Sequence, residues 1–256
     1  MRNFLVNSFI AAAVACVGLL VISRPMPATA PARRAVVVEL FTSEGCSSCP
    51  PADELLSQLR KQGTENGMEV IPLGFHVDYW NYQGWQDRFS SREYSRRQET
   101  YAEKLHTEGP YTPEMVVDGS REFVGNDEAR AHSAIAEAGA EAAVAEVSLN
   151  PQKGKLLVNV AGQPGASGEV WLAITEDNLS SRVAAGENTG RTLHHDAVVR
   201  EFKEIGQLHG GFQAAVPVRF QRDWKRGELR IVVLVQDPRT EKIAGAAEIP
   251  ATDLSQ

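Results

Sequence analysis

VELFTSEGCSSCPPAD, residues 38–53, is the stretch that decides the fold, because it places two cysteines between segments of different periodicity. The apolar run at residues 35–41 precedes the cysteines and is typical of a buried strand. A helical pattern follows them at residues 51–59. A C-x-x-C pair at a strand-to-helix junction is the layout of a thiol–disulfide redox site. We therefore expect Cys46 to be the exposed, attacking thiol and Cys49 to be the resolving thiol.

Two other roles for the cysteine pair stay open on the sequence alone. The pair can form a stable local disulfide, in a protein that binds or assembles without catalysis. It can also handle copper, with His76 as a third ligand beside Cys46 and Cys49, although a strand-end histidine more often makes only a hydrogen bond. The favoured interpretation, thiol–disulfide exchange, needs no metal and no other cofactor.

The residues next to the cysteines affect their expected reactivity. Pro50 and Pro51 do not fit inside a helix that begins at Cys46, so the regular helix is predicted to start with Pro51 at its first position. Asp53, Glu54 and Glu44 place negative charge near the thiols. Since like charge disfavours a thiolate, we expect Cys46 to be less activated than in a strongly oxidising enzyme.

Residues 1–32 have the pattern of an export signal. Arg2 supplies the positive charge, and a nearly continuous apolar run covers residues 4–22. Small-x-small triplets at residues 28–30 and 30–32 resemble cleavage sites, and cleavage after the second is favoured. An uncleaved anchor is the alternative, because the run approaches the ~20 residues that span a bilayer. The body of the protein is thus expected to be periplasmic or secreted, or anchored to the inner membrane and facing outward.

The charge balance and the cysteine pair indicate which partners to expect. The chain has 256 residues and a formal net charge of -7. This acidic balance argues against nucleic acid or anionic lipid as the main partner. The expected partners are protein thiols or disulfides, and membrane contact is expected only through the N-terminal anchor.

The order of predicted elements changes near residue 143. Before it, strands alternate with helices: strands are predicted at residues 36–41, 68–75 and 114–118, and helices at 52–62, 90–106 and 129–146. After it, strands dominate, at residues 147–149, 155–160, 169–175, 212–220 and 228–236, with one helix at 195–206. We therefore predict an α/β domain with some parallel strands at residues 33–143. A mostly antiparallel, β-sandwich-like domain is predicted at residues 144–256.

Motifs spread along the chain resemble those of one protein family. They are the cysteine stretch, FHVDYW at residues 75–80, GW at 84–85, YTPEMVVDG at 111–119, GENTGRTL at 186–193 and VVR at 198–200. Together they resemble the DUF1223 family, exported bacterial proteins of the thioredoxin-like superfamily with no settled activity. The resemblance implies that residues 33–143 are thioredoxin-like. It also implies a cis peptide bond between Thr112 and Pro113, which would border a groove for an extended peptide beside Cys46.

Three further segments carry polar or aromatic side chains. The loop at residues 78–87 contains Trp80 and Trp85, which are candidate substrate-binding residues on a peptide-docking rim; a packed loop is the alternative. The charged stretch at residues 91–104 mixes both signs, as a solvated helix face does. The His-His-Asp triplet at residues 194–196 begins the helix predicted in the second domain, and its favoured role is structural.

Overall fold

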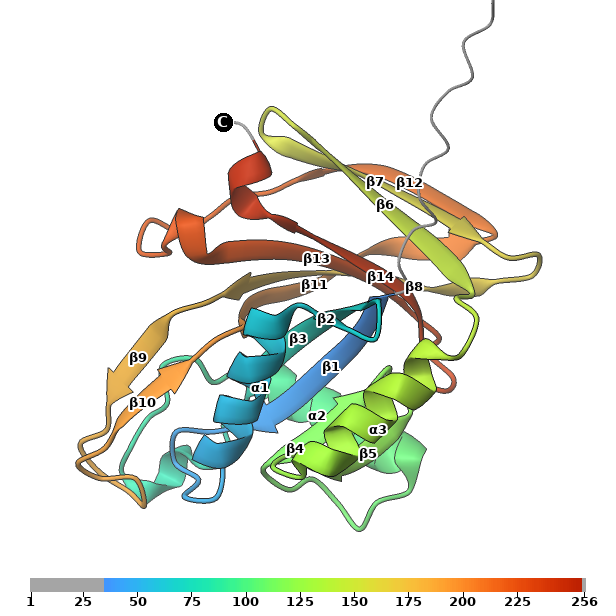
Figure 1. Ribbon diagram of the computed structural model, residues 1–256. Coiled ribbons are helices and arrows are strands. Elements are labelled where there is room, and N and C mark those ends of the chain that lie inside the picture. The colour runs from blue at the N-terminus through green and yellow to red at the C-terminus, as the bar shows by residue number, and fades with distance from the viewer. Residues whose placement is uncertain (1–34, 255–256) are drawn as a thin grey trace, which may run out of the picture. The chain divides into compact units, whose positions relative to one another are not determined.

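The computed structural model describes residues 35–254, so the predicted export signal at residues 1–32 lies outside the described residues. In the first part of the chain, strands and helices alternate as predicted (Figure 1). Their bounds are β1 Ala35–Thr42, α1 Pro50–Gln62, β2 Thr64–Glu65, β3 Met68–His76, η1 Asn81–Gln83, α2 Arg92–Leu105, β4 Glu114–Val117, β5 Arg121–Val124 and α3 Glu128–Gly139.

Strand β1 is central to this part because both of its faces are buried. It pairs in parallel with β3, with Phe41 beside Phe75, and antiparallel with β4, with Leu40 beside Met115. Successive side chains of a strand point to opposite faces. Leu40 packs with α1 and α3, whereas Phe41 packs with α2. Helices α1 and α3 therefore cover one face of the sheet and α2 covers the other (Figure 1).

The second part of the chain is built from strands, and one sheet joins the two parts. Its elements are β6 Ala145–Gln152, β7 Lys155–Gly162, β8 Ser167–Glu176, β9 Leu179–Arg182, β10 Thr192–His195, β11 Val198–His209, β12 Gly211–Pro217, η2 Arg226–Glu228, β13 Leu229–Gln236, β14 Ile243–Pro250 and η3 Ala251–Asp253. Among the described residues, the larger sheet has 12 strands and the main order β14-β13-β8-β11-β3-β1-β4-β5. The two parts join where β11 pairs in parallel with β3, at Val198 and Gly74.

Strands β6, β7 and β12 form a second layer over β8 and β13 (Figure 1). Val158 of β7 shares a core with Leu172 of β8 and Val233 of β13. This arrangement is compatible with the predicted β-sandwich. The change from helix to strand falls between α3 and β6, close to the predicted boundary at residues 143–144. The division into two domains stays a prediction, because one sheet spans both parts.

The helix predicted at residues 195–206 is wrong. Strand β10 ends at His195, and β11 begins at Val198 and pairs antiparallel with β8 along most of its length. The helical pattern of this segment was short, and pairing with a neighbouring strand outweighs such a weak local preference. Strands β9 and β10 form a separate 2-stranded hairpin between β8 and β11.

Two helix limits also differ from the prediction. Helix α1 begins at Pro50 rather than Pro51, because the N–H that Pro50 lacks is among those left unpaired in the first helical turn. Helix α3 ends at Gly139, because Ala145 and the residues after it pair with β7 instead of continuing a helix to residue 146.

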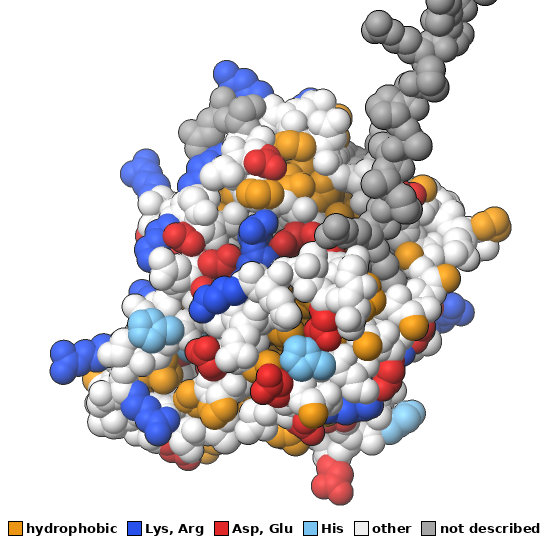
Figure 2. Space-filling model, viewed as in Figure 1, with side chains coloured by type: hydrophobic (Ala, Val, Ile, Leu, Met, Phe, Trp, Pro, Cys, Tyr) orange, Lys and Arg blue, Asp and Glu red, His pale blue; other side chains and the backbone are white. Residues whose placement is uncertain are grey.

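The surface of the described residues carries charges of both signs. On the face shown in Figure 2, Lys and Arg side chains are interspersed with Asp and Glu side chains. Tyr82, in the aromatic loop at residues 78–87, is a large apolar side chain that is 80% exposed. No helix within residues 35–254 is long and apolar enough to cross a membrane.

Candidate disulfide site

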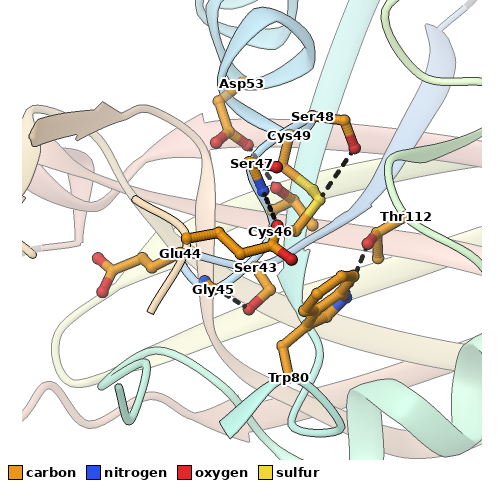
Figure 3. The surroundings of a disulfide bond; sticks show 12 residues. Ser43, Glu44, Gly45, Cys46, Ser47, Ser48, Cys49, Asp53, Trp80 and Thr112 are labelled. Carbon is orange, nitrogen blue, oxygen red and sulfur yellow. Dashed lines mark hydrogen bonds between the residues drawn. A yellow bond between two sulfur atoms is a disulfide. The ribbon is translucent and has the colours of Figure 1, made fainter. Parts of the chain in front are cut away.

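Cys46 and Cys49 form a disulfide between the end of β1 and the start of α1 (Figure 3). Their Cα atoms are 5.4 Å apart, and both residues are 0% exposed. The expectation of an exposed Cys46 is therefore not met in this structure. Ser47 and Ser48, which lie between the cysteines, are exposed, and Ser48 Oγ lies 3.3 Å from Cys46 Sγ. Any reagent that attacks the disulfide needs the surrounding groups to move.

Trp80 connects the cysteine loop, residues 43–49 between β1 and α1, to Thr112 and Pro113. Its indole Nε1 donates a hydrogen bond of 2.8 Å to Thr112 Oγ1 (Figure 3). It also packs so closely on Gly45 that a Cβ added there would lie 3.0 Å from Trp80 Cβ. The peptide bond between Thr112 and Pro113 is cis, as the family resemblance implied. Three of the predicted substrate-binding residues, Trp80, Thr112 and Pro113, are thus linked to the cysteine loop.

Trp85, the fourth predicted substrate-binding residue, is attached to a different residue of the cysteine loop. Its indole Nε1 donates a hydrogen bond of 2.7 Å to Glu44 Oε2. The ring is partly exposed, whereas Glu44 is fully buried. Trp85 therefore binds the cysteine loop through Glu44. This contact fits the alternative prediction, in which the loop at residues 78–87 is a packed loop rather than a docking rim.

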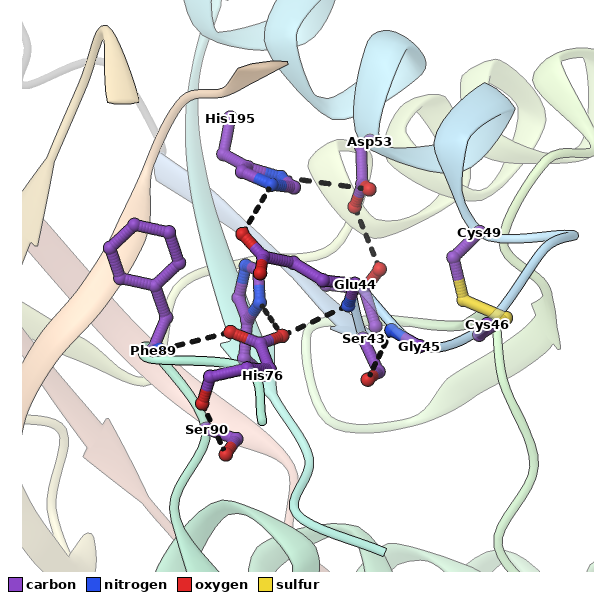
Figure 4. A network of polar contacts seen from close by, with 12 residues as sticks. Ser43, Glu44, Gly45, Cys46, Cys49, Asp53, His76, Phe89, Ser90 and His195 are labelled. Carbon is purple, nitrogen blue, oxygen red and sulfur yellow. Dashed lines mark hydrogen bonds and ion pairs between the residues drawn. A yellow bond between two sulfur atoms is a disulfide. The ribbon is translucent and has the colours of Figure 1, made fainter. Parts of the chain in front are cut away.

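Behind the disulfide lies a cluster of ionisable side chains at the carboxyl ends of β1 and β3 (Figure 4). This buried His–carboxylate cluster consists of Glu44, Asp53, His76, Asp87 and His195, each at most 7% exposed. His76 Nδ1 lies 2.7 Å from Asp87 Oδ2, and the same oxygen accepts a hydrogen bond from the Glu44 N–H at 2.9 Å. Asp53 Oδ1 accepts a bond of 2.8 Å from the Thr42 hydroxyl. Four members come from the first part of the chain, but His195 comes from β10.

His195 is the most poorly bonded member of the cluster. Its Nε2 lies 3.3 Å from Glu44 Oε1, and its Nδ1 lies 3.7 Å from Asp53 Oδ2. Both distances are within ion-pair range but longer than the 2.7 Å between His76 and Asp87, and neither contact has the geometry of a hydrogen bond among the described residues. Its ring stands nearly perpendicular to that of His76, with the ring centroids 4.9 Å apart.

Burial and mutual contacts shift the pKa values of the cluster in opposite directions. Burial alone would lower the pKa of His76, but the Asp87 carboxylate raises that pKa above its ordinary value of 6.5. Burial alone would raise the pKa of Asp87, but His76 brings it below 3.8. The pKa of Asp53 is raised by burial, despite His195 nearby. The cluster thus combines a His76–Asp87 ion pair with a carboxyl group that keeps its proton to a higher pH than usual.

The loop between β9 and β10 binds the cysteine loop directly. Asn188 is fully buried, and its Nδ2 donates hydrogen bonds to the carbonyls of Glu44 at 3.0 Å and Cys46 at 2.9 Å. Glu187 Oε2 accepts a bond of 3.0 Å from the Ser47 N–H. Sequence reasoning missed these contacts and that of His195. Two sequence signals were available. The GENTGRTL motif at residues 186–193 served only for the family resemblance, and the His-His-Asp triplet at residues 194–196 was interpreted as structural.

The copper alternative gains no support from this geometry. His76 Nδ1 is bonded to Asp87, and the two sulfur atoms are joined to each other. In the part of the chain that the structure describes, no group of three or more His, Cys, Asp or Glu residues could hold a metal ion. Copper handling stays a prediction.

A second buried polar group, on the α2 face of the sheet, corrects the prediction of a wholly solvated helix face at residues 91–104. Arg97 donates to both carboxylate oxygens of Glu39, at 2.6 and 2.8 Å. Its remaining nitrogen donates to Gln236 Oε1 at 3.0 Å, and the Tyr101 hydroxyl donates to Glu39 Oε1 at 2.6 Å. In this Arg97–Glu39 network, Arg97 and Tyr101 share a helix face because they are four residues apart.

A family model described as "Protein of unknown function (DUF1223)" matches residues 37–236. The chain belongs to the DUF1223 family. No curated protein matches this DUF1223 protein significantly. Among solved structures, it is similar to protein AGR_C_4864 from Agrobacterium tumefaciens, with 26% identity and a TM-score of 0.71 over 87% of this chain and 96% of that chain. It is also similar in fold to HBP35 of Porphyromonas gingivalis, with 15% identity and a TM-score of 0.64 over 87% of this chain and 77% of that chain.

Proposed function

We propose that this DUF1223 protein is an exported, thioredoxin-like protein that exchanges thiols and disulfides through Cys46 and Cys49. The observation that carries the proposal is the cysteine pair itself, closed as a disulfide where β1 leads into α1. The parallel pairing of β1 with β3, and the link from Trp80 to the Thr112–Pro113 segment, support the thioredoxin-like assignment. An oxidising compartment outside the cytoplasm is where such a pair is maintained as a disulfide.

In the reducing direction, the Cys46 thiolate attacks one sulfur of a substrate disulfide. The substrate S–S bond breaks, and its electron pair leaves with the second substrate sulfur, which takes up a proton. The Cys49 thiol then loses its proton and attacks Cys46 Sγ, which closes the Cys46–Cys49 disulfide and releases the first substrate sulfur as a thiol. Two electrons and two protons pass to the substrate in total, and the opposite direction reverses each step.

A disulfide-exchange assay with insulin, run with wild type and Cys46→Ser, tests this proposal. We expect turnover by the wild type and none by the variant, because Cys49 alone cannot complete the cycle. The reduction potential of the pair is measured on the same sample, and exchange requires a value in the range of about −120 to −270 mV found for exchange proteins. Wild-type activity equal to that of the variant would overturn the proposal.

The second candidate function is a non-catalytic binding or assembly module with a structural disulfide. The complete burial of both cysteines favours it, because structural disulfides are shielded from exchange. This function predicts a reduction potential below about −300 mV and a melting temperature that falls when the disulfide is reduced.

A further inference from the structure

The disulfide is closed off, although exchange requires a thiolate to reach one of its sulfur atoms. Cys46 and Cys49 are both 0% exposed. Thiol–disulfide exchange proceeds by direct attack of a thiolate on sulfur, so its rate depends on access. A protein partner therefore cannot react with this disulfide until a covering element moves.

The loop between β9 and β10 is bound to the cysteine loop by a small number of polar contacts. Asn188 holds the carbonyls of Glu44 and Cys46, and Glu187 holds the N–H of Ser47. Each of these bonds joins a side chain of the hairpin loop to the backbone of the cysteine loop. Breaking them costs no bond of the 12-stranded sheet, because β9 and β10 pair with each other in a separate sheet.

The base of the hairpin has the features of a pair of hinges. Asn178 and Ala197, which flank it, have φ values of 56° and 55°, in the left-handed region that non-glycine residues rarely adopt. The N–H of Asn178 donates to Asp196 Oδ1, and that of Ala197 donates to Asp177 Oδ1, both at 2.8 Å. Hinge motions are usually absorbed by a few residues at the ends of elements, which is where these two lie.

The inner face of the hairpin buries the apolar side chains of Leu179, Val183 and Leu193, but its histidine has only long polar contacts. His195 of β10 reaches Glu44 and Asp53 only at 3.3 and 3.7 Å, without a hydrogen bond among the described residues. Lifting the hairpin exposes its buried apolar side chains, but it also lets water hydrogen-bond the imidazole, whose present contacts are long. Hydration of His195 therefore offsets part of the cost of opening.

We propose that the β9–β10 hairpin covers the Cys46–Cys49 disulfide, is held shut by Asn188 and Glu187, and turns about Asn178 and Ala197 to admit a thiol partner. This proposal concerns regulation of the site and rests on the proposed function. Asn188 and Glu187 are positioning residues in it, since they act through the backbone of the cysteine loop.

Glu187 also gives the closed hairpin a negative charge close to Cys46. Its hydrogen bonds from Ser47 lower the pKa of its carboxyl below 4.5, so it is charged at neutral pH. It occupies a backbone N–H near the start of α1, where such groups would otherwise favour a Cys46 thiolate. The closed hairpin therefore both hides Cys46 and opposes its ionisation.

The test is the rate at which excess dithiothreitol reduces the disulfide in the full chain, with the released thiols trapped by alkylation. The reagent supplies two electrons and two protons and becomes a cyclic disulfide. The variants are Asn188→Ala, Glu187→Ala and Glu187→Gln, with Glu99→Gln as matched control. Glu99 is an exposed carboxylate of α2.

We expect Asn188→Ala to be reduced about tenfold faster than wild type, because both hydrogen bonds from this side chain to the cysteine loop are lost. Glu187→Ala is expected to accelerate reduction by about threefold, since one bond and one charge are lost. Glu187→Gln keeps a carbonyl acceptor for Ser47, so its reduction rate stays near that of wild type while the pKa of the reduced Cys46 thiol falls. Hydrogen exchange is expected to show that the β9–β10 amides open without global unfolding.

If all folded variants and the control are reduced at rates within twofold of one another, the proposal that the β9–β10 hairpin covers the disulfide is overturned. It would also be overturned if Trp80→Ala alone accelerated reduction, because the covering element would then be the loop at residues 78–87. If Asn188→Ala and Glu187→Ala are reduced faster but neither they nor wild type exchange with insulin, the cover stands and the proposed function fails.

Discussion

The protein buries two polar clusters, one on the α2 face of β1 and the other beyond the carboxyl end of that strand, and they are bonded very differently. In the Arg97–Glu39 network, all the guanidinium nitrogens and both carboxylate oxygens have hydrogen-bond partners, at 2.6–3.0 Å. In the buried His–carboxylate cluster, His76 and Asp87 are well paired, but both nitrogens of His195 and one oxygen of Glu44 lack hydrogen bonds among the described residues.

This difference separates a structural network from a candidate functional one. A completely bonded ion pair holds α2 in place against the sheet and leaves no group free for chemistry. Buried polar atoms without hydrogen-bond partners are uncommon in folded proteins, and a functional role is one explanation for them. The incompletely bonded cluster is also the one behind the disulfide, at the carboxyl ends of parallel strands, where ligands of α/β proteins bind.

The largest effect is expected from Arg97→Met, which leaves Glu39 buried without its cation. We expect a loss of about 3–5 kcal/mol in the free energy of unfolding, measured by urea denaturation. Arg96→Met, at the exposed neighbour on the same helix, is the control. The double variant with Glu39→Met should recover most of the loss, because two well-packed apolar side chains replace the pair. A loss below about 1 kcal/mol for Arg97→Met would show that the network is not structural.

Glu114, on the same face as the network, provides the next test. Burial raises its pKa from 4.5 to about 7, and its Oε1 lacks a hydrogen bond among the described residues. Wild-type stability should therefore decrease as the pH rises from 4.5 through 7, because the folded state holds this proton more tightly than the unfolded state. Above that range Glu114→Gln should be more stable than wild type by up to about 3 kcal/mol, and below it the two should agree. Parallel stability curves from pH 4 to 8 would contradict this.

Asp87→Asn tests the well-bonded half of the cluster and should cost about 1.5–3 kcal/mol, because a hydrogen bond between charged groups is lost. The lowered pKa of Asp87 stabilises the fold above pH 3.8, and this contribution disappears as the pH falls through the folded pKa. The raised pKa of His76 stabilises it below pH 6.5, and this contribution disappears as the pH rises through the folded pKa. The free energy of unfolding that Asp87→Asn loses, measured by denaturation, should thus be largest between pH 3.8 and 6.5. Asp223→Asn, at a side chain that is 73% exposed, should show no such pH dependence.

The smallest effect is expected from His195→Phe, because its contacts with Glu44 Oε1 and Asp53 Oδ2, at 3.3 and 3.7 Å, are longer than the 2.7 Å contact of His76 with Asp87. Unfolding free energy should change by less than about 1 kcal/mol. His76→Phe is the matched comparison and should cost more, since it leaves Asp87 without its partner. Equal losses for both variants would show that His195 is bonded as firmly as His76, and the contrast between the two buried groups would fail.

Local sequence was sufficient for the elements with a strong periodic pattern. The apolar run of β1 and the helical pattern after Cys49 predicted a buried strand and a helix, and both form within two residues of the predicted limits. The segment at residues 195–206 failed because its short pattern is ambiguous, and pairing with β8 decided its structure. Arg97 was assigned to solvent because a charged helix pattern does not reveal that a buried carboxylate, Glu39, lies opposite one of its positions.

The sequence by itself determined the cysteine pair, the strand-to-helix junction that carries it and membership of the DUF1223 family, since these depend on residues that are neighbours along the chain. Only the tertiary structure decided the surroundings of that pair. Asn188 lies 142 residues from Cys46 in sequence, yet it donates a hydrogen bond to the Cys46 carbonyl. No local pattern encodes such a contact, because it depends on how β8 and β11 are placed in the sheet from which the hairpin extends. The burial of both cysteines is therefore a property of the complete fold.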